Sequence, residues 1–302
     1  MSSAPTSENW TTRKLLSWMG EAFTRKGLDN PRLFAEMLLA HVLGCERLRL
    51  YMEADRPASN DERERLRDLV KRALADEPVQ YLIGTGWFFG LPMKVDRRVL
   101  IPRPSTETIV EHALQHARAG GRPKGEGLLI ADVCTGSGCI AIALLKTLTQ
   151  ARAVATDVSL EALELAEENA RQHKVEERVD FVRGDLLAAL DDFPASAGKG
   201  ALDYLVSNPP YVPDFEWDAI EPNVKNFEPH GALRGGADGL DFVRPVLTGG
   251  PERLKPGGLM LVEVADAHAD EAAKIAEGAG LREVRVLRDW EGLKRAIVGV
   301  RL

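Results

Sequence analysis

Residues 128–141 of the 302-residue chain read Leu-Leu-Ile-Ala-Asp-Val-Cys-Thr-Gly-Ser-Gly-Cys-Ile-Ala. The first six residues form a short apolar run that ends at a glycine-rich turn, and this is typical of a buried strand. Apolar residues continue to Leu148 and predict a helix from Ile140 onward. A strand, a tight turn and a helix in this order begin a βαβ unit, whose strands pair in parallel. The stretch therefore predicts an α/β protein.

The same alternation of strand and helix patterns continues toward the C-terminus. It predicts a Rossmann-like, doubly wound parallel sheet with helices on both faces. The expected strands are 128–133, 151–157, 179–182, 202–207, 259–264, 284–287 and 296–300, and the expected helices are 140–148, 160–172 and 267–278.

The first part of the chain has a different, helical pattern. Residues 12–75 carry apolar side chains at helical spacing, with Ser59 and Glu62 in a capping box. Residues 79–101 are rich in aromatic residues and glycine, which favours a β-hairpin, and a further helix is expected from Pro104 to 118. We predict three parts, namely a helical substrate-recognition domain at 1–78, a hairpin linker at 79–101 and a catalytic domain at 102–302.

Composition narrows the class of protein. The chain is 44% hydrophobic and 28% charged, so it can bury a sizeable core, and no apolar run approaches the 18 residues of a membrane span. The first residues do not resemble a signal peptide, and the three cysteines form no CxxC pair. We expect a cytoplasmic protein with reduced thiols, no membrane association and no metal site.

The charge distribution argues against stable binding to nucleic acid. Lys and Arg number 39 against 46 Asp and Glu, for a net charge of −7. Residues 1–95 carry 14 basic and 13 acidic side chains, or +1, which leaves −8 for the remainder. A negatively charged catalytic region repels phosphate backbones and lacks the basic surface of most nucleic-acid-binding proteins.

The glycine turn after residue 133 has the spacing of a nucleoside-binding loop. Gly136, Gly138 and Ala141 fit the G-x-G-x-x-G/A pattern, in which glycine lets the backbone approach a ligand at a helix N-terminus. Asp157 follows Gly138 by 19 residues, at the end of the next strand, where a carboxylate accepts ribose hydroxyls. An adenosine-bearing cofactor is expected, and this pattern alone leaves both NAD and S-adenosylmethionine open.

A second motif, Asn208-Pro209-Pro210-Tyr211, ends the fourth expected strand. Ligands of doubly wound sheets bind outside the carboxyl ends of the strands near the switch point, which is where this motif falls. The two prolines stiffen the turn and have no N–H, so carbonyl groups remain free to accept hydrogen bonds. Asn-Pro also begins ordinary turns, which is the alternative interpretation.

With this motif the chain resembles the amino-methylating Rossmann methyltransferases, which carry [DNS]PP[YFW] and methylate a planar nitrogen. Segments 100–107, 206–211, 227–229 and 238–241 are similar to the protein-glutamine methyltransferases, most of all to the release-factor branch, and the resemblance begins near residue 12. It implies S-adenosylmethionine as cofactor and the Gly-Gly-Gln glutamine of a peptide chain release factor as substrate. Residues 87–90 resemble instead the branch that acts on a large-subunit ribosomal protein. Ser105 and Cys134 replace the acid and the glycine usual in the release-factor branch.

The resemblance also assigns roles to residues. The Asn208 side-chain oxygen and the Pro209 carbonyl would each accept one N–H of the target amide. Tyr211 would pack against that amide or form a wall of the substrate slot. Arg103 and Glu107 would lie at the mouth of the cofactor and substrate site. The expected catalytic residues are Asn208, Pro209, Pro210 and Tyr211, and the expected cofactor contacts are Asp132, Cys134, Thr135, Gly136, Ser137, Gly138, Asp157, Asp185, Leu186 and Asn208.

Three other functions compete with this interpretation. An adenine methyltransferase of DNA or RNA would need a basic target-recognition region, which the acidic catalytic part lacks. A nicotinamide-dependent oxidoreductase would leave the Asn-Pro-Pro-Tyr turn unexplained. A binding module without activity would have no need of both an intact cofactor turn and an intact Asn208.

Overall fold

The computed structural model describes residues 10–191 and 199–302. These residues divide into two compact units. The first, the helical unit, contains the described residues up to Gly84 together with Pro222–Phe227, and the second, the sheet unit, contains the described residues of Thr85–Glu221 and Glu228–Leu302.

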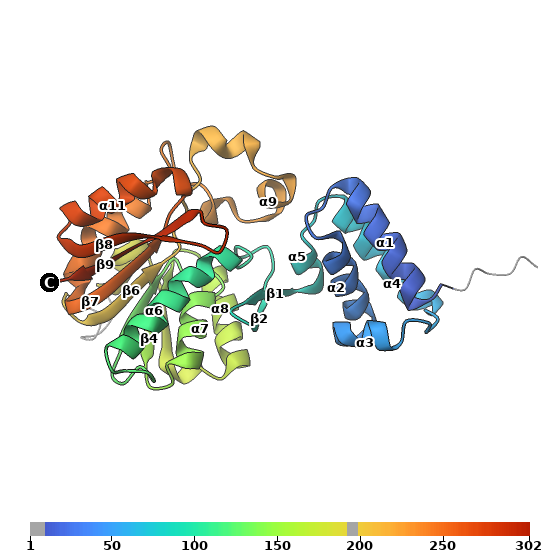
Figure 1. Cartoon of the computed structure of the whole chain (residues 1–302), viewed down its shortest axis with the longest axis horizontal. Helices are drawn as coiled ribbons and strands as arrows, with labels where there is room; N and C mark the ends of the chain where they lie inside the picture. The colour runs from blue at the N-terminus through green and yellow to red at the C-terminus, as the bar shows by residue number, and fades with distance from the viewer. Residues whose placement is uncertain (1–9, 192–198) are drawn as a thin grey trace, which may run out of the picture. The chain divides into compact units, whose positions relative to one another are not determined.

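The helical unit is built from amphipathic helices whose ends are set by local sequence (Figure 1). Ser59 and Glu62 form the expected capping box at the start of one helix, and Gly44 ends another in the left-handed conformation that glycine adopts without strain. Met19 and Phe23 are fully buried in the core of the helical unit. The helices are α1 (Thr12–Lys26), α2 (Pro31–Leu43), α3 (Arg47–Met52), α4 (Asn60–Leu74), α5 (Val79–Ile83) and α9 (Pro222–Phe227).

The expected hairpin is shorter than the 79–101 linker predicted from sequence. Its strands are β1 (Thr85–Phe88) and β2 (Leu91–Lys94), which pair antiparallel. Residues 79–83 form helix α5 instead, because Val79 and Leu82 are both buried and lie three residues apart, on one helical face. Gly84 ends this short helix with a φ of 69°.

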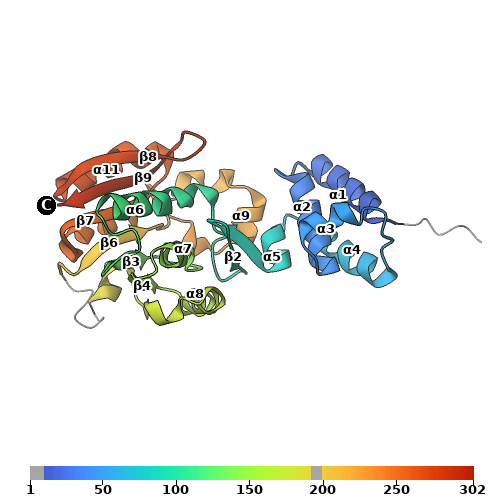
Figure 2. The same cartoon turned by 60° about the horizontal axis from the view of Figure 1, so that its bottom comes forward.

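The sheet unit contains, within the described residues, a seven-stranded sheet in the order β5-β4-β3-β6-β7-β9-β8. Strands β3 to β7 run parallel, as predicted, whereas β9 runs antiparallel to both of its neighbours. Figure 2 shows β8 and β9 near helix α11. The strands are β3 (Leu129–Val133), β4 (Arg152–Asp157), β5 (Val179–Arg183), β6 (Leu202–Ser207), β7 (Leu254–Glu263), β8 (Leu281–Arg288) and β9 (Lys294–Arg301).

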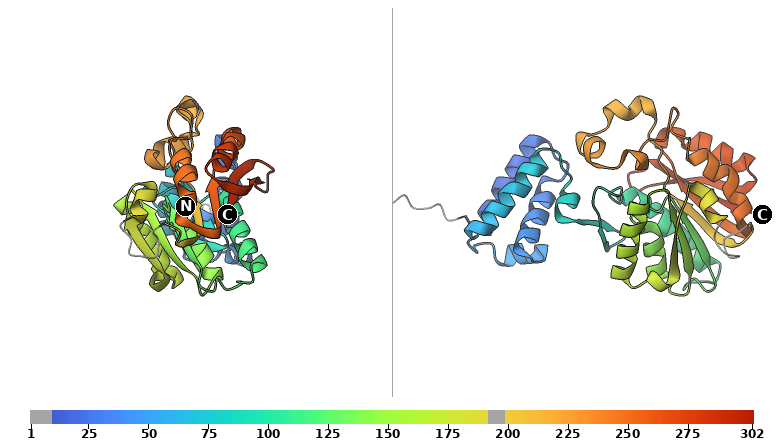
Figure 3. Two further views of the ribbon diagram at one scale, coloured as in Figure 1. Left: turned by 90° about the vertical axis from the view of Figure 1, so that its left-hand side faces the viewer. Right: turned by 180° about the vertical axis from the view of Figure 1, so that it is seen from behind.

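Helices cover both faces of this sheet (Figures 1 and 3). Helices α10 (Val243–Gly249) and α11 (Ala269–Gly278) pack on one face, in a core that includes Val133 and Val262 of the strands. The other face carries α6 (Glu107–Ala119), α7 (Cys139–Thr147) and α8 (Leu160–His173). A 3-10 turn, η1 (Pro104–Thr106), precedes α6 directly.

Within the sheet unit, a fully buried side chain binds the hairpin to the rest of the fold. Asn169 of α8 is fully buried and bonds both backbone groups of Lys94, accepting from its N–H at 2.7 Å and donating to its carbonyl at 3.1 Å. The same amide group donates to the Ser137 carbonyl of the glycine turn at 2.9 Å. Asn169 therefore connects the hairpin backbone with the turn that follows β3.

No helix in the part of the chain that the structure describes combines the length and the apolar character needed to span a bilayer.

Candidate functional site

A cavity of about 200 Å³ opens in the sheet unit at the carboxyl ends of the parallel strands. Its walls come from the segments that follow β3, β4, β5 and β6, and from residues 98–106. Strand β3 pairs with β4 on one side and with β6 on the other, so the cavity lies where the order of the strands reverses. Doubly wound sheets bind ligands at this place.

The glycine turn forms one wall of the cavity. Gly136 and Gly138 have φ angles of 55° and 78°, which glycine adopts without a steric penalty. A Cβ at Gly138 would also lie 3.2 Å from the Cβ of Ala166, because the turn packs closely on α8. Cys134, which also lines the cavity, has a φ of 62° although it carries a side chain. Thr135, Gly136 and Ser137 line the cavity as well.

Asp132 lies behind this turn and does not line the cavity. Its Oδ2 accepts hydrogen bonds from the Thr135 hydroxyl at 2.7 Å and from the Ala141 N–H at 3.1 Å, so it joins the turn to the start of α7. Burial raises the pKa of this carboxyl to about 7. The structure thus gives Asp132 a supporting position, whereas the sequence suggested a direct cofactor contact.

Asp157 lines the cavity at the end of β4. Its two oxygens accept backbone N–H groups from Gly136 and Ser159, both at 2.9 Å. The pKa of Asp157 is raised above its usual value, because burial outweighs these backbone hydrogen bonds, which lower it. Each carboxylate oxygen has a second lone pair, so the ribose hydroxyls of a nucleoside can still bind here.

Asp185 and Leu186, which follow β5, also line the cavity. Leu186 is half-buried with a φ of 47°, and Ile140 adds a second apolar side chain to the lining. A Cβ at Gly184 would come within 2.7 Å of the Ala189 Cβ, so only glycine fits where this segment turns. Apolar walls beside a carboxylate and a glycine turn match the adenine, ribose and amino-acid parts of S-adenosylmethionine in chemical character.

The Asn-Pro-Pro-Tyr turn follows β6, and only part of it meets the cavity. Asn208 and Pro210 line the cavity, whereas Pro209 is buried and does not. The Asn208 side-chain Nδ2 donates to the Thr106 hydroxyl at 3.2 Å, which leaves Oδ1 to accept from a ligand. Tyr211 is half-buried and donates its hydroxyl to Glu263 Oε1 at 3.0 Å, outside the cavity lining.

Arg103 and Glu107, both expected at the mouth of the site, separate in the structure. Arg103 lines the cavity, and its Nη2 lies 2.5 Å from Glu228 Oε1. Glu228 is only 3% exposed and also accepts the Ile101 N–H at 3.0 Å, so it fixes the segment that carries Arg103. Glu107 does not line the cavity, because its carboxylate accepts the Phe89 N–H at 2.7 Å in the hairpin turn.

Three side chains at the site were missed by the sequence interpretation. Thr106 and Glu263 complete the hydrogen bonds around Asn208 and Tyr211, and Glu228 holds Arg103. A weak signal existed for Glu263, since a carboxylate there ends an otherwise apolar strand. Glu228 lies in segment 227–229, which was singled out only for its resemblance to the family, and no local pattern predicts that its carboxylate binds Arg103.

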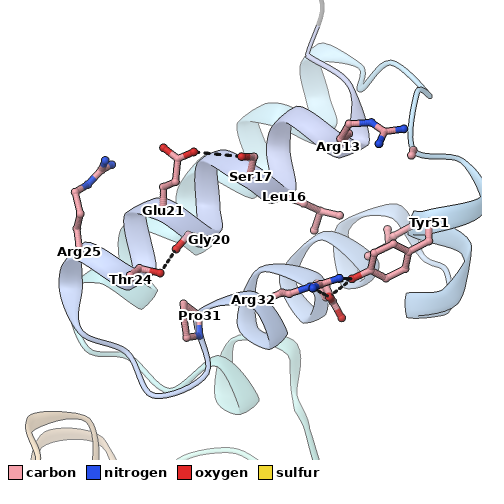
Figure 4. A pocket seen from close by; sticks show the side chains of 13 residues that line it. Arg13, Leu16, Ser17, Gly20, Glu21, Thr24, Arg25, Pro31, Arg32 and Tyr51 are labelled. Atoms are coloured by element: carbon pink, nitrogen blue, oxygen red, sulfur yellow. Dashed lines mark hydrogen bonds and ion pairs between the residues drawn. The ribbon is translucent and has the colours of Figure 1, made fainter.

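A second, more open cavity of about 640 Å³ lies within the helical unit, along α1 and α2 (Figure 4). Leu16 and Gly20 of α1 line it together with Arg32 and Tyr51. Glu36 lies buried at its base and accepts hydrogen bonds from Arg32, Arg47 and Tyr51. In the ranges 10–191 and 199–302, no cluster of three or more His, Cys, Asp or Glu side chains has an arrangement that would hold a metal ion.

Two family models match the chain. One, described as the PrmC N-terminal domain, matches residues 14–84, and the other, described as the methyltransferase small domain, matches residues 123–234.

Curated relatives match nearly the whole chain. The release factor glutamine methyltransferase of Chlorobaculum tepidum is 41% identical, over 97% of this chain and 98% of its own length. The enzymes of the same name from Geobacter sulfurreducens and Rhodopirellula baltica are 39% and 36% identical, with coverage of 97% and 95% of both chains, respectively.

Solved structures support the fold. The N-terminal domain of human METTL16, determined in complex with SAH, aligns with a TM-score of 0.51 and 18% identity over 81% of this chain and 85% of its own. The hMettl16 catalytic domain in complex with an RNA hairpin gives a TM-score of 0.52 at 16% identity, over 70% and 76% of the two chains. The sheet unit therefore has a class I methyltransferase fold.

Proposed function

This chain belongs to the release factor glutamine methyltransferases, and on that premise we propose that it methylates the side-chain amide nitrogen of a glutamine in a peptide chain release factor. The methyl donor in this proposal is S-adenosylmethionine. One observation carries it: the glycine turn, Asp157 and Asn208 line a single cavity, so a nucleoside-binding wall and an amide-binding group face the same space.

The cofactor part of the proposal uses the walls of the cavity. Asp157 would accept the ribose hydroxyls, Leu186 and Ile140 would contact the adenine, and Gly136 would let the backbone approach the ligand. When bound, S-adenosylmethionine supplies an electrophilic methyl group on a positively charged sulfur. Asp185 would stand near the adenine end.

The substrate part of the proposal depends on the orientation of a weak nucleophile. An amide nitrogen shares its lone pair with the carbonyl, which is the origin of the rotation barrier of about 18–20 kcal/mol. Asn208 Oδ1 and the carbonyl of Pro209, which lies in the chain between the lining residues Asn208 and Pro210, would each accept one N–H of the glutamine and hold its nitrogen in line with the methyl group. Acceptors placed in advance favour the transition state, in which positive charge grows on this nitrogen. Arg103 would lie at the substrate side of the same cavity.

The helical unit would then recognise the protein around the glutamine. It has a cavity of its own and a nearly neutral charge, and its family model is distinct from that of the methyltransferase part. The remainder of the chain carries a net charge of −8, which favours a protein substrate over DNA or RNA. We also propose that the activity is cytoplasmic, because the proposed substrate belongs to the translation machinery.

Methyl transfer from labelled S-adenosylmethionine, measured side by side on purified release factor, total ribosomal protein and DNA, tests the function. We expect label on release factor, at one glutamine located by mass spectrometry. Label on ribosomal protein alone would show that ribosomal protein, and not release factor, is the substrate. Calorimetry with S-adenosylhomocysteine and with NAD tests the cofactor separately, and tight binding of NAD alone would overturn that part.

A further inference from the structure

A carboxylate that the proposed chemistry does not use lies buried beside Asn208. Glu263 is the last residue of β7 and is fully buried. Strands β6 and β7 pair in parallel with Ser207 opposite Val262, so the next residues, Asn208 and Glu263, are neighbours at the carboxyl end of the sheet. A buried charged group is costly unless other groups compensate it, so its partners indicate what it does.

Two hydroxyl groups of the site face this carboxylate. Tyr211 donates to Oε1 at 3.0 Å. The pKa of Glu263 is raised above its usual value, because burial outweighs the opposing effects of the Thr106 and Tyr211 hydroxyls and of the positive charges of Arg295 and Arg103. Within the described residues, Oε2 has no hydrogen bond of ordinary geometry, so it remains an open acceptor for the Thr106 proton.

We propose that Glu263 is a positioning residue that fixes the orientation of the Asn208 amide through Thr106. The inference rests on the proposed function, because it concerns which atom of Asn208 meets the glutamine. A carboxyl oxygen that carries no proton only accepts hydrogen bonds, as we infer for Oε2, and a hydroxyl has a single proton. When the Thr106 proton points to Glu263, Thr106 Oγ1 can only accept from Asn208.

This direction of hydrogen bonding determines which end of Asn208 faces the substrate. Thr106 Oγ1 receives Nδ2 of Asn208 at 3.2 Å, so the opposite atom, Oδ1, is presented to the ligand. If the chain of hydrogen bonds ran the other way, Thr106 would donate to Oδ1, and the Asn208 NH₂ group would meet the N–H groups of the glutamine. Two sets of donors repel, so the nitrogen would not be held. Glu263 thus acts on the reaction without touching the substrate.

The Glu263→Gln variant tests this directly, because glutamine keeps an acceptor for Tyr211 but offers Thr106 a donor. We expect kcat on release factor to fall about ten- to hundred-fold, the loss typical of a misplaced reacting group. KM for release factor and the Kd of S-adenosylhomocysteine should stay within about two-fold of native. Asp203→Asn is the matched control, since Asp203 is also a buried carboxylate of the same sheet but lies outside the cavity lining; its kcat should stay native.

Two Thr106 variants provide an independent test that does not depend on the folding of the Glu263 variant. Thr106→Val removes the hydroxyl at nearly constant volume and should lose kcat to the same degree as Glu263→Gln. Thr106→Ser restores the hydroxyl and should recover most of that loss. A role in packing alone predicts the reverse order, because valine fills the buried site better than serine.

A double-mutant cycle shows whether Glu263 acts through Asn208. If it does, Glu263→Gln should have little further effect in an Asn208→Ala background. If Glu263→Gln lowers kcat by the same factor in the native and the Asn208→Ala backgrounds, or leaves kcat native, the inference is wrong while the proposed function stands. Absence of any release factor methylation by the native enzyme would instead overturn the proposed function.

Discussion

The Asn208 side chain has a hydrogen-bond donor, Nδ2, and an acceptor, Oδ1, and only the donor has a partner among the residues that the structure describes. Its Nδ2 is committed to Thr106, so the expected contribution to catalysis comes from Oδ1. Replacement by alanine removes the acceptor and should lower kcat about a hundred- to thousand-fold, equivalent to about 2.7–4 kcal/mol. Aspartate keeps an acceptor but loses the donor to Thr106, so Asn208→Asp should lie between native and alanine. Turnover on release factor at saturating cofactor measures the order.

Cofactor affinity serves as the control for these variants. Asn208 and Asp157 line the same cavity but lie at the ends of different strands, β6 and β4, so the Asp157 contacts stay in place and S-adenosylhomocysteine should bind the variants nearly as tightly as the native enzyme. An alanine variant with near-native turnover would show that Asn208 only shapes its turn.

Asp132 gives a prediction on stability and pH. Its pKa is raised from 3.8 to about 7, so the folded state favours the protonated form. The corresponding stabilisation is complete below pH 3.8 and is lost as the pH rises through about 7. Asp132→Asn has no such titration. Between pH 5 and pH 7 the free energy of unfolding of the native chain should therefore fall by about 2 kcal/mol relative to that of Asp132→Asn. One pKa unit corresponds to about 1.4 kcal/mol.

Urea unfolding of both chains without cofactor, repeated at pH 5, 6, 7 and 8, measures this difference. All other titrating groups are common to the two chains and cancel in the comparison. Parallel curves over this range would mean that Asp132 is ionised throughout. The observed geometry favours titration, because Asp132 Oδ1 is buried without a partner in the described part of the chain.

At the level of elements, two glycines should respond oppositely to replacement by alanine. Gly138 lies in the turn between β3 and α7, and Gly20 lies in the middle of helix α1. Gly138 has a φ of 78°, and a Cβ there would lie 3.1 Å from Ile142 Cδ1 and 3.2 Å from Ala166 Cβ. Gly138→Ala should therefore destabilise the fold by roughly 1–2 kcal/mol from the backbone conformation alone. Gly20 is helical, and a Cβ there meets no atom within 4 Å, so Gly20→Ala should stabilise by about 0.5–1 kcal/mol.

Thermal and urea unfolding of the two alanine variants measure these opposite signs. The pair is matched in chemistry, so a shared change in stability would mean that the two backbone conformations do not differ as described. Binding of S-adenosylhomocysteine should weaken in Gly138→Ala and stay native in Gly20→Ala, since only the first glycine belongs to the cavity turn.

The elements were largely predictable because their signals are local. The strand and helix alternation was confirmed from β3 to β9, since each pattern lies within about ten residues. Helix α5 was mistaken for a strand because five residues carry too little periodicity and the burial of Val79 and Leu82 depends on tertiary contacts. The antiparallel direction of β9 is also a tertiary property that no local pattern carries.

The site was predictable only in part, for the same reason. Some site residues belong to short, recognisable sequence motifs. Examples are Gly136, Asp157 and Asn208, which line one cavity as the sequence suggested. Their supports come from distant segments: Asn208 bonds Thr106, 102 residues away, and Glu228 bonds Arg103, 125 residues away. A single sequence contains no signal for such pairs.

At the scale of the whole molecule, a truncation tests whether the sheet unit binds the cofactor while the helical unit selects the protein substrate. A chain that begins at Thr85 keeps every residue of the cavity at the carboxyl ends of the strands. It should bind S-adenosylhomocysteine with an affinity within a few-fold of native and methylate intact release factor at least a hundred-fold more slowly. Calorimetry and labelled methyl transfer measure the two properties.

A short peptide containing the target glutamine provides the comparison for this truncation. Both chains should methylate the peptide slowly and equally, because neither gains contacts from the rest of the substrate. If the truncated chain methylates intact release factor at the native rate, the helical unit does not select the substrate.

The hydrogen bonds of Asn169 limit how the sequence of this protein can vary in length. Asn169 binds both backbone groups of Lys94 and the carbonyl of Ser137, so one side chain fixes the position of the end of the hairpin against the glycine turn. An insertion between Thr85 and Lys94 would shift the pairing by a residue and turn alternate side chains to the wrong face. Surface loops elsewhere accept extra residues at little cost. Fusion tags and inserted domains therefore belong outside the hairpin, which behaves as a segment of fixed length.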